Sequence, residues 1–325
     1  MRDYRFDVAR VVCMTYIVAF MHLYAYVYPE GRDTYYIPAC VAFVDACLGL
    51  FTFVSGYLLG LKYTFGDEGS SGLWAFYKKR ILRIIPLYIL ALIALWLIGF
   101  NEGKPTLSGM LCISPFVWVR PRTLWYIPII LCCYLITPLV SRKGIAWRIN
   151  SSLGILLFLI GLKFSFPSID HRLLYNMFFY LIGIVTASCF DWTFKVRYGA
   201  LIKMTIVLLF MILLVGGLFT SLYAYSLYKL TVKCLGVFAI LFVCEVISNG
   251  VFEKKMQLGR LFLNVSYASM ACYMFHRFFY WVGESVWNPS DTSVKWIYMT
   301  GVVFPIIIVL SYAIQKVYDN IIKRL

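Results

Sequence analysis

The feature that most constrains this chain is a series of long apolar runs, and the first of them shows the problem they pose. Between Val11 and Val27 the only side chain that can carry a charge near neutral pH is His22. A helix of about 20 apolar residues crosses the hydrocarbon core of a bilayer, so this run is long enough to span a membrane. An ionisable group inside such a span is costly and by default indicates a functional site.

The rest of the chain has the same character. Of its 325 residues 62% are hydrophobic and 14% are charged, whereas a soluble domain is about 45–50% apolar and about 25% charged. This composition predicts an all-α, polytopic integral membrane bundle forming a single domain over residues 1–325. The net charge of +15 does not indicate nucleic acid, because the basic residues lie in short clusters between apolar runs, as membrane topology requires. The ten cysteines form no C-x-x-C pair and are interpreted as small apolar residues.

Ten runs are candidate membrane spans. They cover residues 8–29, 40–62, 81–100, 124–141, 151–165, 172–190, 199–222, 226–248, 262–284 and 295–318. No cleavage site follows the first run, so it is predicted to be a retained span rather than a signal peptide. An even number of spans places both termini on the same side of the membrane.

The basic residues predict that this side is the cytoplasm, because cytoplasmic loops are enriched in Lys and Arg. With the N-terminus inside, two thirds of the 30 basic residues fall on the cytoplasmic side. They are Arg2, Arg5, Arg10, Lys62, Lys78, Lys79, Arg80, Arg83, Arg142, Lys143, Arg148, Lys195, Arg197, Lys203, Lys254, Lys255, Arg260, Lys316, Lys323 and Arg324.

Three ionisable residues are predicted to lie at similar depth. His22 and His276 are each about 14 residues into an outward-running span, or roughly 21 Å from the cytoplasmic boundary, and Asp45 lies roughly 8 Å below the outer boundary. A carboxylate beside a buried histidine holds the imidazole in one tautomer, as a general base requires. The alternative is that His22 only hydrogen-bonds a neighbouring helix.

A second constellation lies at the start of the third span. Lys78, Lys79, Arg80 and Arg83 precede Pro86, and the two arginines share a helix face. Four cations at a helix start oppose its positive terminus unless an anion binds there. Two interpretations remain open: a positive-inside anchor touching lipid phosphate, or a pocket for a phosphorylated ligand, for which Arg is well suited.

Two shorter motifs have simpler explanations. Ser55 and Gly56 place a hydroxyl and a missing side chain on one helix, and small residues of this kind allow close helix packing. Trp125 and Tyr126 begin a predicted outer helix and suit an interfacial aromatic belt.

Taken in order, these motifs resemble the membrane acyltransferase 3 family. The series runs from an entrance D-x-x-R and a following histidine, through F-x-F-V-S-G-Y, R-x-x-R-x-x-P-x-Y and L-W-Y, to S-x6-Y-x2-H near the end. The residues that carry it are Asp7, Arg10, His22, Phe51–Tyr57, Arg80, Arg83, Pro86, Tyr88, Leu124–Tyr126, Tyr134, Pro138, Ser266, Tyr273 and His276.

The resemblance implies about ten transmembrane helices in a bacterial inner or plasma membrane. It also implies an acyl-CoA donor, expected to be acetyl-CoA, and O-acylation of a carbohydrate such as a cell-surface polysaccharide or its lipid-linked precursor. The arginine and histidine of the first span are implied to matter most. In this chain these are Arg10 and His22.

The chain departs from the family pattern at one informative place. The family usually has ten residues between this arginine and histidine, and here there are eleven. A separation of 12 positions turns His22 about 120° away from Arg10 on an ideal helix. A one-residue π-bulge would restore the register, so we predict a bulge between Val11 and Met21. The family also often has an acidic residue at the position where this chain has Gly49. Asp45 is therefore a candidate site residue only because of its predicted depth.

These observations combine into one hypothesis. The donor phosphates are expected near Lys78, Lys79, Arg80 and Arg83, with Arg10 and Ser55 also near the donor, and the thioester near His22. His22 would act as general base or form a transient acyl-imidazole. His276, Tyr273 and Trp125 would position the acceptor or stabilise the oxyanion.

Other functions remain open at this stage. A ten-helix transporter or flippase also carries ionisable groups at mid-membrane depth, although no internal repeat is visible. A membrane sensor leaves the motif series unexplained. The three histidines lack metal-binding spacing, so no metal is expected, and His171 is assigned to an outer loop. The expected partners are acyl-CoA, a carbohydrate acceptor, membrane lipid and, in an oligomer, a second copy of the chain.

Overall fold

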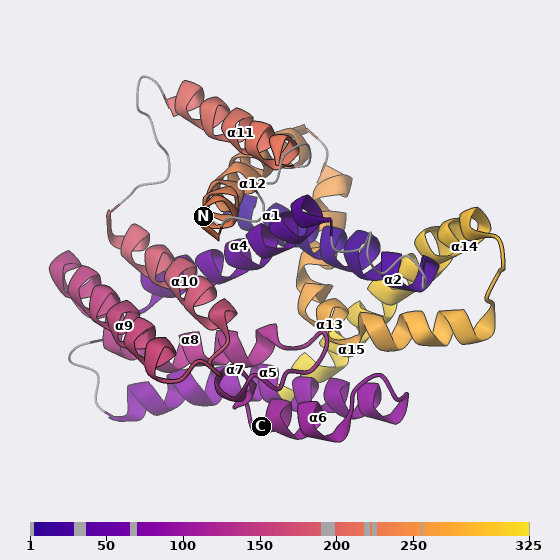
Figure 1. The fold of residues 1–325 in the computed structure, drawn as a ribbon, viewed down its shortest axis with the longest axis horizontal. Helices are drawn as coiled ribbons and strands as arrows, with labels where there is room; N and C mark the ends of the chain where they lie inside the picture. Colours follow the sequence, from indigo (N-terminus) through magenta and orange to yellow (C-terminus); the bar gives the residue numbers. More distant parts are fainter. Residues whose placement is uncertain are drawn as a thin grey trace. The chain divides into compact units, whose positions relative to one another are not determined.

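The structure, a computed structural model, describes residues 3–28, 37–65, 70–189, 199–217, 222, 226–254 and 256–324. Apart from one isolated bridge between Phe65 and Arg142, regular structure in the described residues is helical (Figure 1). This agrees with the all-α class expected from the apolar runs.

The chain contacts divide into two compact units. Unit 1 consists of Met1–Leu50 and Lys195–Leu325, and unit 2 of Phe51–Phe194. Helix α4 (Pro38–Lys62) contributes its first half to unit 1 and its second half to unit 2. That the whole chain acts as one domain stays a prediction.

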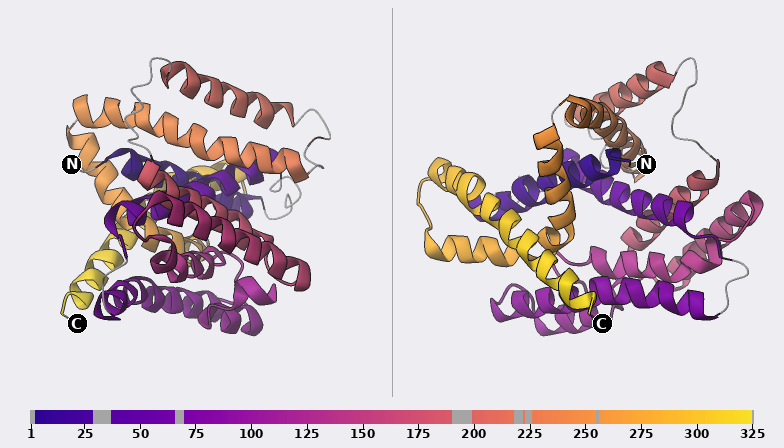
Figure 2. Two further views of the ribbon diagram at one scale, coloured as in Figure 1. Left: turned by 90° about the vertical axis from the view of Figure 1, so that its left-hand side faces the viewer. Right: turned by 180° about the vertical axis from the view of Figure 1, so that it is seen from behind.

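Unit 1 begins with a continuous helix made of three pieces, α1 (Arg5–Thr15), η1 (Tyr16–His22) and α2 (Leu23–Val27). Within this unit α11 lies along α12, and α13 lies along α15 (Figure 2). Its remaining described elements are α11 (Gly199–Gly216), α12 (Ser226–Lys254), α13 (Met256–Val286), α14 (Thr292–Tyr298), η3 (Met299–Val303) and α15 (Phe304–Ile322).

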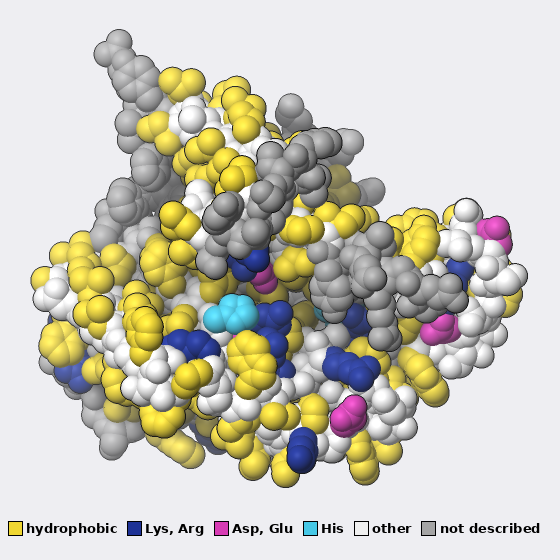
Figure 3. Space-filling model, in the orientation of Figure 1, with side chains coloured by type: hydrophobic (Ala, Val, Ile, Leu, Met, Phe, Trp, Pro, Cys, Tyr) yellow, Lys and Arg dark blue, Asp and Glu magenta, His cyan; other side chains and the backbone are white. Residues whose placement is uncertain are grey.

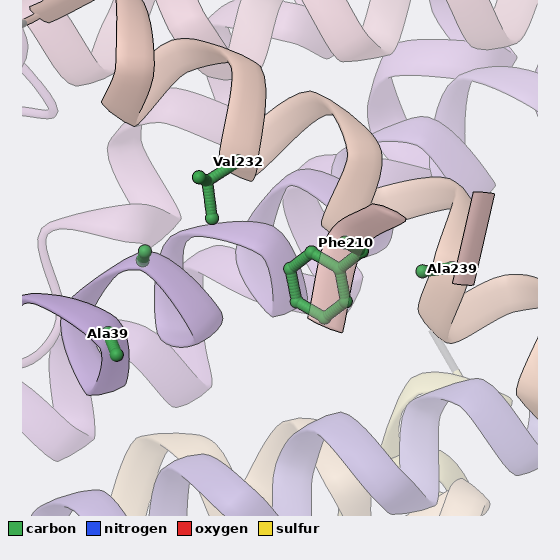
Figure 4. Packing of buried hydrophobic residues seen from close by; sticks show 5 residues of the cluster. Ala39, Phe210, Val232 and Ala239 are labelled. Atoms are coloured by element: carbon green, nitrogen blue, oxygen red, sulfur yellow. The ribbon is translucent and has the colours of Figure 1, made fainter. Parts of the chain in front are cut away.

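One part of the unit 1 core is built around Phe210. This α11 side chain packs in a cluster with Ala39 of α4 and with Val232 and Ala239 of α12 (Figure 4). A Cβ atom at Gly236 would lie 2.8 Å from the Phe210 ring. Small residues therefore let these apolar helices approach closely, which is how membrane helices gain packing energy.

Unit 2 contains the second half of α4 and, in its described residues, six further helices. They are α5 (Ser70–Leu97), α6 (Gly103–Met110), α7 (Ser114–Val117), α8 (Tyr126–Val140), α9 (Ile145–Ser165) and α10 (His171–Cys189). Helices α9 and α10 pack side by side (Figure 1).

The closest helix crossing of unit 2 explains the Ser55–Gly56 motif. A Cβ atom at Gly56 would lie 2.1 Å from the carbonyl oxygen of Tyr180, and one at Gly183 would lie 2.3 Å from that of Phe53. Gly60 of α4 meets Ala187 of α10 in the same way. Small residues four apart on both helices form the small-xxx-small pattern of close membrane helix pairs, so the predicted packing role of Gly56 is confirmed.

The helices fit a multi-pass membrane protein. Seven stretches of the described residues are long and apolar enough to cross a bilayer: Arg5–Val27, Pro38–Lys62, Gly72–Leu97, Ile145–Ser165, Gly199–Gly216, Leu227–Val251 and Thr292–Ile322. The apolar window of Gly199–Gly216 is only 11% buried within the protein, as a lipid-facing helix should be. Hydrophobic side chains also dominate the face drawn in Figure 3.

The other three predicted spans are helical but weaker. Tyr126–Val140 is apolar but shorter, and α10 and α13 carry more polar residues. The exact number of spans and the cytoplasmic location of both termini therefore stay predictions. Helix α5 begins at Ser70, eleven residues before the predicted start of the third span at position 81.

Candidate active site

The first span contains the irregularity that its motif spacing predicted. Residues Tyr16–His22 form a π-helix between α1 and α2. A π-helix accommodates an extra residue relative to an α-helix, so the extra residue between Arg10 and His22 is absorbed there. The prediction of a bulge between Val11 and Met21 is confirmed.

Side chains of α13 bind the carbonyl groups of this π-helix. The hydroxyl of Tyr280 donates to the Val18 carbonyl oxygen at 3.2 Å, and Arg277 donates to that of His22 at 3.3 Å. Tyr26, one turn beyond, donates to the carbonyl oxygen of Arg277 at 3.0 Å. Backbone groups inside a membrane need partners within the protein, so α13 stabilises the irregular segment.

The two membrane histidines meet directly. Nδ1 of His22 lies 2.6 Å from Nε2 of His276, the ring planes differ by 6° and the ring centroids are 4.8 Å apart. Two stacked rings cannot bring their nitrogens this close, so the rings meet edge to edge through a hydrogen bond. His276 is fully buried, whereas His22 is only partly buried.

The surroundings of His276 determine which nitrogens carry protons when both rings are neutral. Nδ1 of His276 lies 2.8 Å from the carbonyl oxygen of Tyr273 and 3.2 Å from that of Cys272. A carbonyl only accepts, so Nδ1 of His276 must be protonated and its Nε2 accepts. The proton between the rings therefore belongs to Nδ1 of His22, which leaves the lone pair on Nε2 of His22. This is the tautomer that a general base needs.

The entrance motif forms a second polar contact between the same two helices. Ser266 of α13 donates to the buried carboxylate of Asp7 at 2.7 Å, and Arg10 lies 3.6 Å from the same oxygen. Ser266, Ser269, Tyr273 and His276 follow one another at spacings of three, four and three, which places them along one stripe of α13. From Ser266 to His276 this stripe rises about 15 Å.

The predicted partnership between Asp45 and His22 was wrong. The carboxylate of Asp45 forms an ion pair with Lys233 of α12, and the group that holds the His22 ring is His276. A charged group in a membrane span is stabilised by an opposite charge. Lys233 lies inside the predicted span 226–248, where it was visible as an intramembrane charge.

The basic cluster of unit 2 lies within α5 rather than at its start. Because α5 begins at Ser70, the residues from Lys78 to Arg83 follow two or more complete turns. The helix dipole acts within the first turn, so it gives no reason to expect an anion here. Lys78, Lys79 and Arg83 are exposed.

Arg80 is the member of this cluster that packs against the protein. Its guanidinium lies 5.0 Å from the ring centre of Tyr63 and 4.4 Å from that of Phe76, and it donates to the Tyr63 hydroxyl at 3.3 Å. Burial by itself would raise the pKa of Tyr63, but the hydrogen bond from Arg80 and the nearby positive charges outweigh it and lower that pKa. The cluster thus creates a positive potential that favours anions.

The remaining predicted residues of unit 2 have local partners. Ser55 forms a hydrogen bond with Tyr134 of α8. Trp125 immediately precedes α8, as expected for a residue at a helix start, and the guanidinium of Arg172 lies 4.3 Å from its ring centre.

Two arginines have roles that the sequence analysis did not predict. Arg148, counted only as a topology signal, is buried and donates to the carbonyl oxygen of Gly60 at 3.0 Å and to that of Arg142 at 3.0 Å. Arg277, next to His276, was not singled out. Its position inside an apolar run was the signal that could have identified it.

A comparison with protein families supports the geometry. A family model described as "Acyltransferase domain" matches residues 3–316. This chain belongs to the acyltransferase 3 family. No curated protein and no solved structure matches it. The resemblance seen in the motifs is therefore confirmed, and in this membrane acyltransferase two of the three histidines, His22 and His276, are in direct contact.

Proposed function

We propose that this membrane acyltransferase moves an acyl group, expected to be acetyl, from acyl-CoA to a hydroxyl of a cell-surface polysaccharide or its lipid-linked sugar precursor. The observation that carries this proposal is the hydrogen bond between His22 and His276. It holds the proton of His22 on Nδ1 and leaves Nε2 as a base, in a partly buried position of a membrane span.

In the proposed reaction, Nε2 of His22 removes the proton of the sugar hydroxyl while the hydroxyl oxygen attacks the thioester carbonyl. The resulting imidazolium keeps its Nδ1–H bond to His276, which Tyr273 anchors through its carbonyl oxygen. Collapse of the tetrahedral intermediate breaks the C–S bond, and the CoA sulfur takes the proton from Nε2. The products are the sugar ester and free CoA. Direct attack by Nε2 on the thioester, giving an acyl-imidazole, is the alternative route.

The donor is assigned to the cations of α5. Lys78, Lys79, Arg80 and Arg83 carry four positive charges, and the aromatic packing of Arg80 orients its guanidinium. CoA carries several phosphate oxygens, which Arg binds in bidentate fashion. Ser55 is proposed to contribute to donor binding through the same unit.

The remaining roles complete the proposal. Arg10, held by Asp7, orients the donor, and Trp125 and Tyr273 contact the acceptor. Asp45, paired with Lys233, is now assigned to maintaining unit 1 rather than to proton transfer. We place the enzyme in a bacterial inner or plasma membrane. Membership of an acyltransferase family favours transfer over the transport function considered from composition.

The central experiment measures transfer of radiolabelled acetyl from acetyl-CoA to polysaccharide in membranes containing the protein. His22→Ala is expected to lower transfer about 10²–10⁴-fold, the usual contribution of a general base. Lys203→Gln is the control, because this basic residue of the same unit forms a partly exposed ion pair with Glu245 away from the proposed reaction. Transfer by a well-folded His22→Ala protein at the wild-type rate would refute the assignment.

Donor binding is tested separately. The double change Arg80→Gln, Arg83→Gln is expected to weaken CoA binding by about tenfold or more, since one hydrogen bond to a charged group contributes about 1.5–3 kcal/mol. Arg142→Gln with Lys143→Gln is the control, because both are exposed basic residues of unit 2. Equal affinity in the two double variants would reassign the α5 cluster to membrane anchoring.

A further inference from the structure

An exposed tryptophan in unit 2 has an unusual backbone. Trp118, just after α7, adopts φ 59° and ψ 1°, the left-handed region, and its side chain is 45% exposed. A bulky residue rarely adopts this conformation, and such strain persists only where the surrounding structure enforces it. The ring is therefore held at the surface by its neighbours.

Those neighbours are basic. The guanidinium of Arg120 lies 4.7 Å from the Trp118 ring centre and the ammonium of Lys163 lies 5.6 Å from it. The His171 ring is 5.9 Å away, tilted by 40°. An aromatic ring surrounded by three basic side chains, defined here as the Trp118 cluster, presents both an apolar face and positive charge.

The cluster is positioned by buried or backbone groups. Asp170, fully buried, accepts from Arg120 at 2.9 Å, and its other oxygen lies 3.5 Å from Nδ1 of His171. Lys163 donates to the carbonyl oxygen of Pro167 at 2.6 Å. These contacts fix the cations before any ligand arrives, which lowers the cost of binding one.

Positive charge exceeds negative charge at this place. Asp170 is the carboxylate paired with Arg120, while Lys163, Arg172 and Arg120 contribute three positive charges. Burial lowers the pKa of Arg120, and the positive charge of Arg172 lowers it further. Arg172 in turn packs on Trp125 at 4.3 Å. An anion bound here would relieve the repulsion between the two arginines.

We propose that the Trp118 cluster binds an acidic carbohydrate, with the exposed part of the Trp118 ring against a sugar ring and the basic side chains against its carboxylate or phosphate. A lipid headgroup shares the anionic chemistry. However, a membrane anchor needs neither a strained backbone nor cations held by a buried carboxylate. The claim that the cluster docks the acceptor rests on the proposed function. The claim that it binds an acidic saccharide does not.

The test measures binding of tetragalacturonate, without donor, to the full chain in nanodiscs of phosphatidylcholine. Binding is expected, and the neutral methyl ester of the same saccharide is expected to bind about tenfold or more weakly, because it lacks the hydrogen-bonded charges. Trp118→Ala and Lys163→Gln should each reduce the affinity about tenfold. Trp118→Phe, which keeps an aromatic ring, should retain most of it.

Trp74→Ala is the matched control, since this tryptophan is 67% exposed in α5 of the same unit. Failure of tetragalacturonate to bind, equal binding of the methyl ester, or equal loss in Trp74→Ala would overturn the proposal. So would loss of binding in discs containing phosphatidylglycerol, which would identify the cluster as a headgroup anchor. Binding without acetyl transfer would overturn the proposed function instead, and transfer without binding would overturn this inference alone.

Discussion

The contact of η1 with α13 and the contact of α4 with α10 each join two helices, but they do so by opposite means. In the first, α13 side chains bind backbone carbonyls of a π-helix, and His22 donates a hydrogen bond to His276. In the second, glycines have no side chain, so the two backbones can touch. A Cβ atom added at Gly56 would lie only 2.1 Å from a carbonyl oxygen.

This difference separates a reactive contact from a packing contact. A π-helix and buried ionisable groups cost stability and are kept where function needs them. Close glycine packing increases stability and offers no reactive group. Substitutions at the two contacts should therefore affect different quantities: transfer at the first and folding at the second.

The largest effect is expected from changing the length of η1. Deleting Ala19 should convert the π-helix into an α-helix and keep Arg10 and His22 on one face, because a separation of 11 positions returns to the same side of an α-helix. Acetyl transfer should then stay within about tenfold of wild type. Inserting one alanine after Ala19 should rotate His22 away and lower transfer about 10²–10⁴-fold, as loss of the base does. Greater loss in the deletion than in the insertion would contradict the register argument.

Next in size is the effect of filling the α4–α10 crossing. Gly56→Leu should lower the free energy of unfolding by about 1–3 kcal/mol, because overpacking forces the helices apart. Thermal unfolding in detergent measures this. Gly154→Leu is the control, since nothing lies within 4 Å of a Cβ at that position of α9. Equal unfolding temperatures for the Gly56→Leu and Gly154→Leu variants would show that the crossing is not a packing contact.

An effect of similar size is expected at the entrance motif. Ser266→Ala removes the donor to the buried Asp7 carboxylate and should cost about 1.5–3 kcal/mol of stability, the range for hydrogen bonds to charged groups. Ser285→Ala serves as control, because that hydroxyl donates only to its own helix at Trp281. If both serine variants unfold at the same temperature, the contact between Ser266 and Asp7 does not stabilise unit 1.

The smallest effect is expected for an ordinary ion pair of unit 1. Lys203 donates to both carboxylate oxygens of Glu245 at 2.8 Å, and both side chains are about a quarter exposed. Lys203→Gln should lower stability by at most about 1 kcal/mol, as partly exposed pairs do. Its acetyl transfer should be unchanged. A loss of transfer comparable to that of His22→Ala would mean that charge contacts of unit 1 in general, and not the histidine pair, govern activity.

The sequence by itself determined the class of the molecule and one detail of its site. Long apolar runs predicted helices because a backbone in lipid must satisfy its own hydrogen bonds. The eleven residues between Arg10 and His22, one more than is usual in the family that the motifs resemble, predicted the π-helix because helix register depends only on spacing along one segment. The family resemblance could also be seen in the sequence, because each of its motifs lies within one short segment.

The tertiary structure alone decided which residues meet. His22 pairs with His276, 254 positions away, and Asp45 pairs with Lys233 rather than with His22. The predicted depth in the membrane placed His22, His276 and Asp45 at one level, but it does not determine which helix faces which. That choice depends on close packing between helices distant in sequence, such as the contact of Gly236 with Phe210 and Ala46, and no spacing within a single run encodes it.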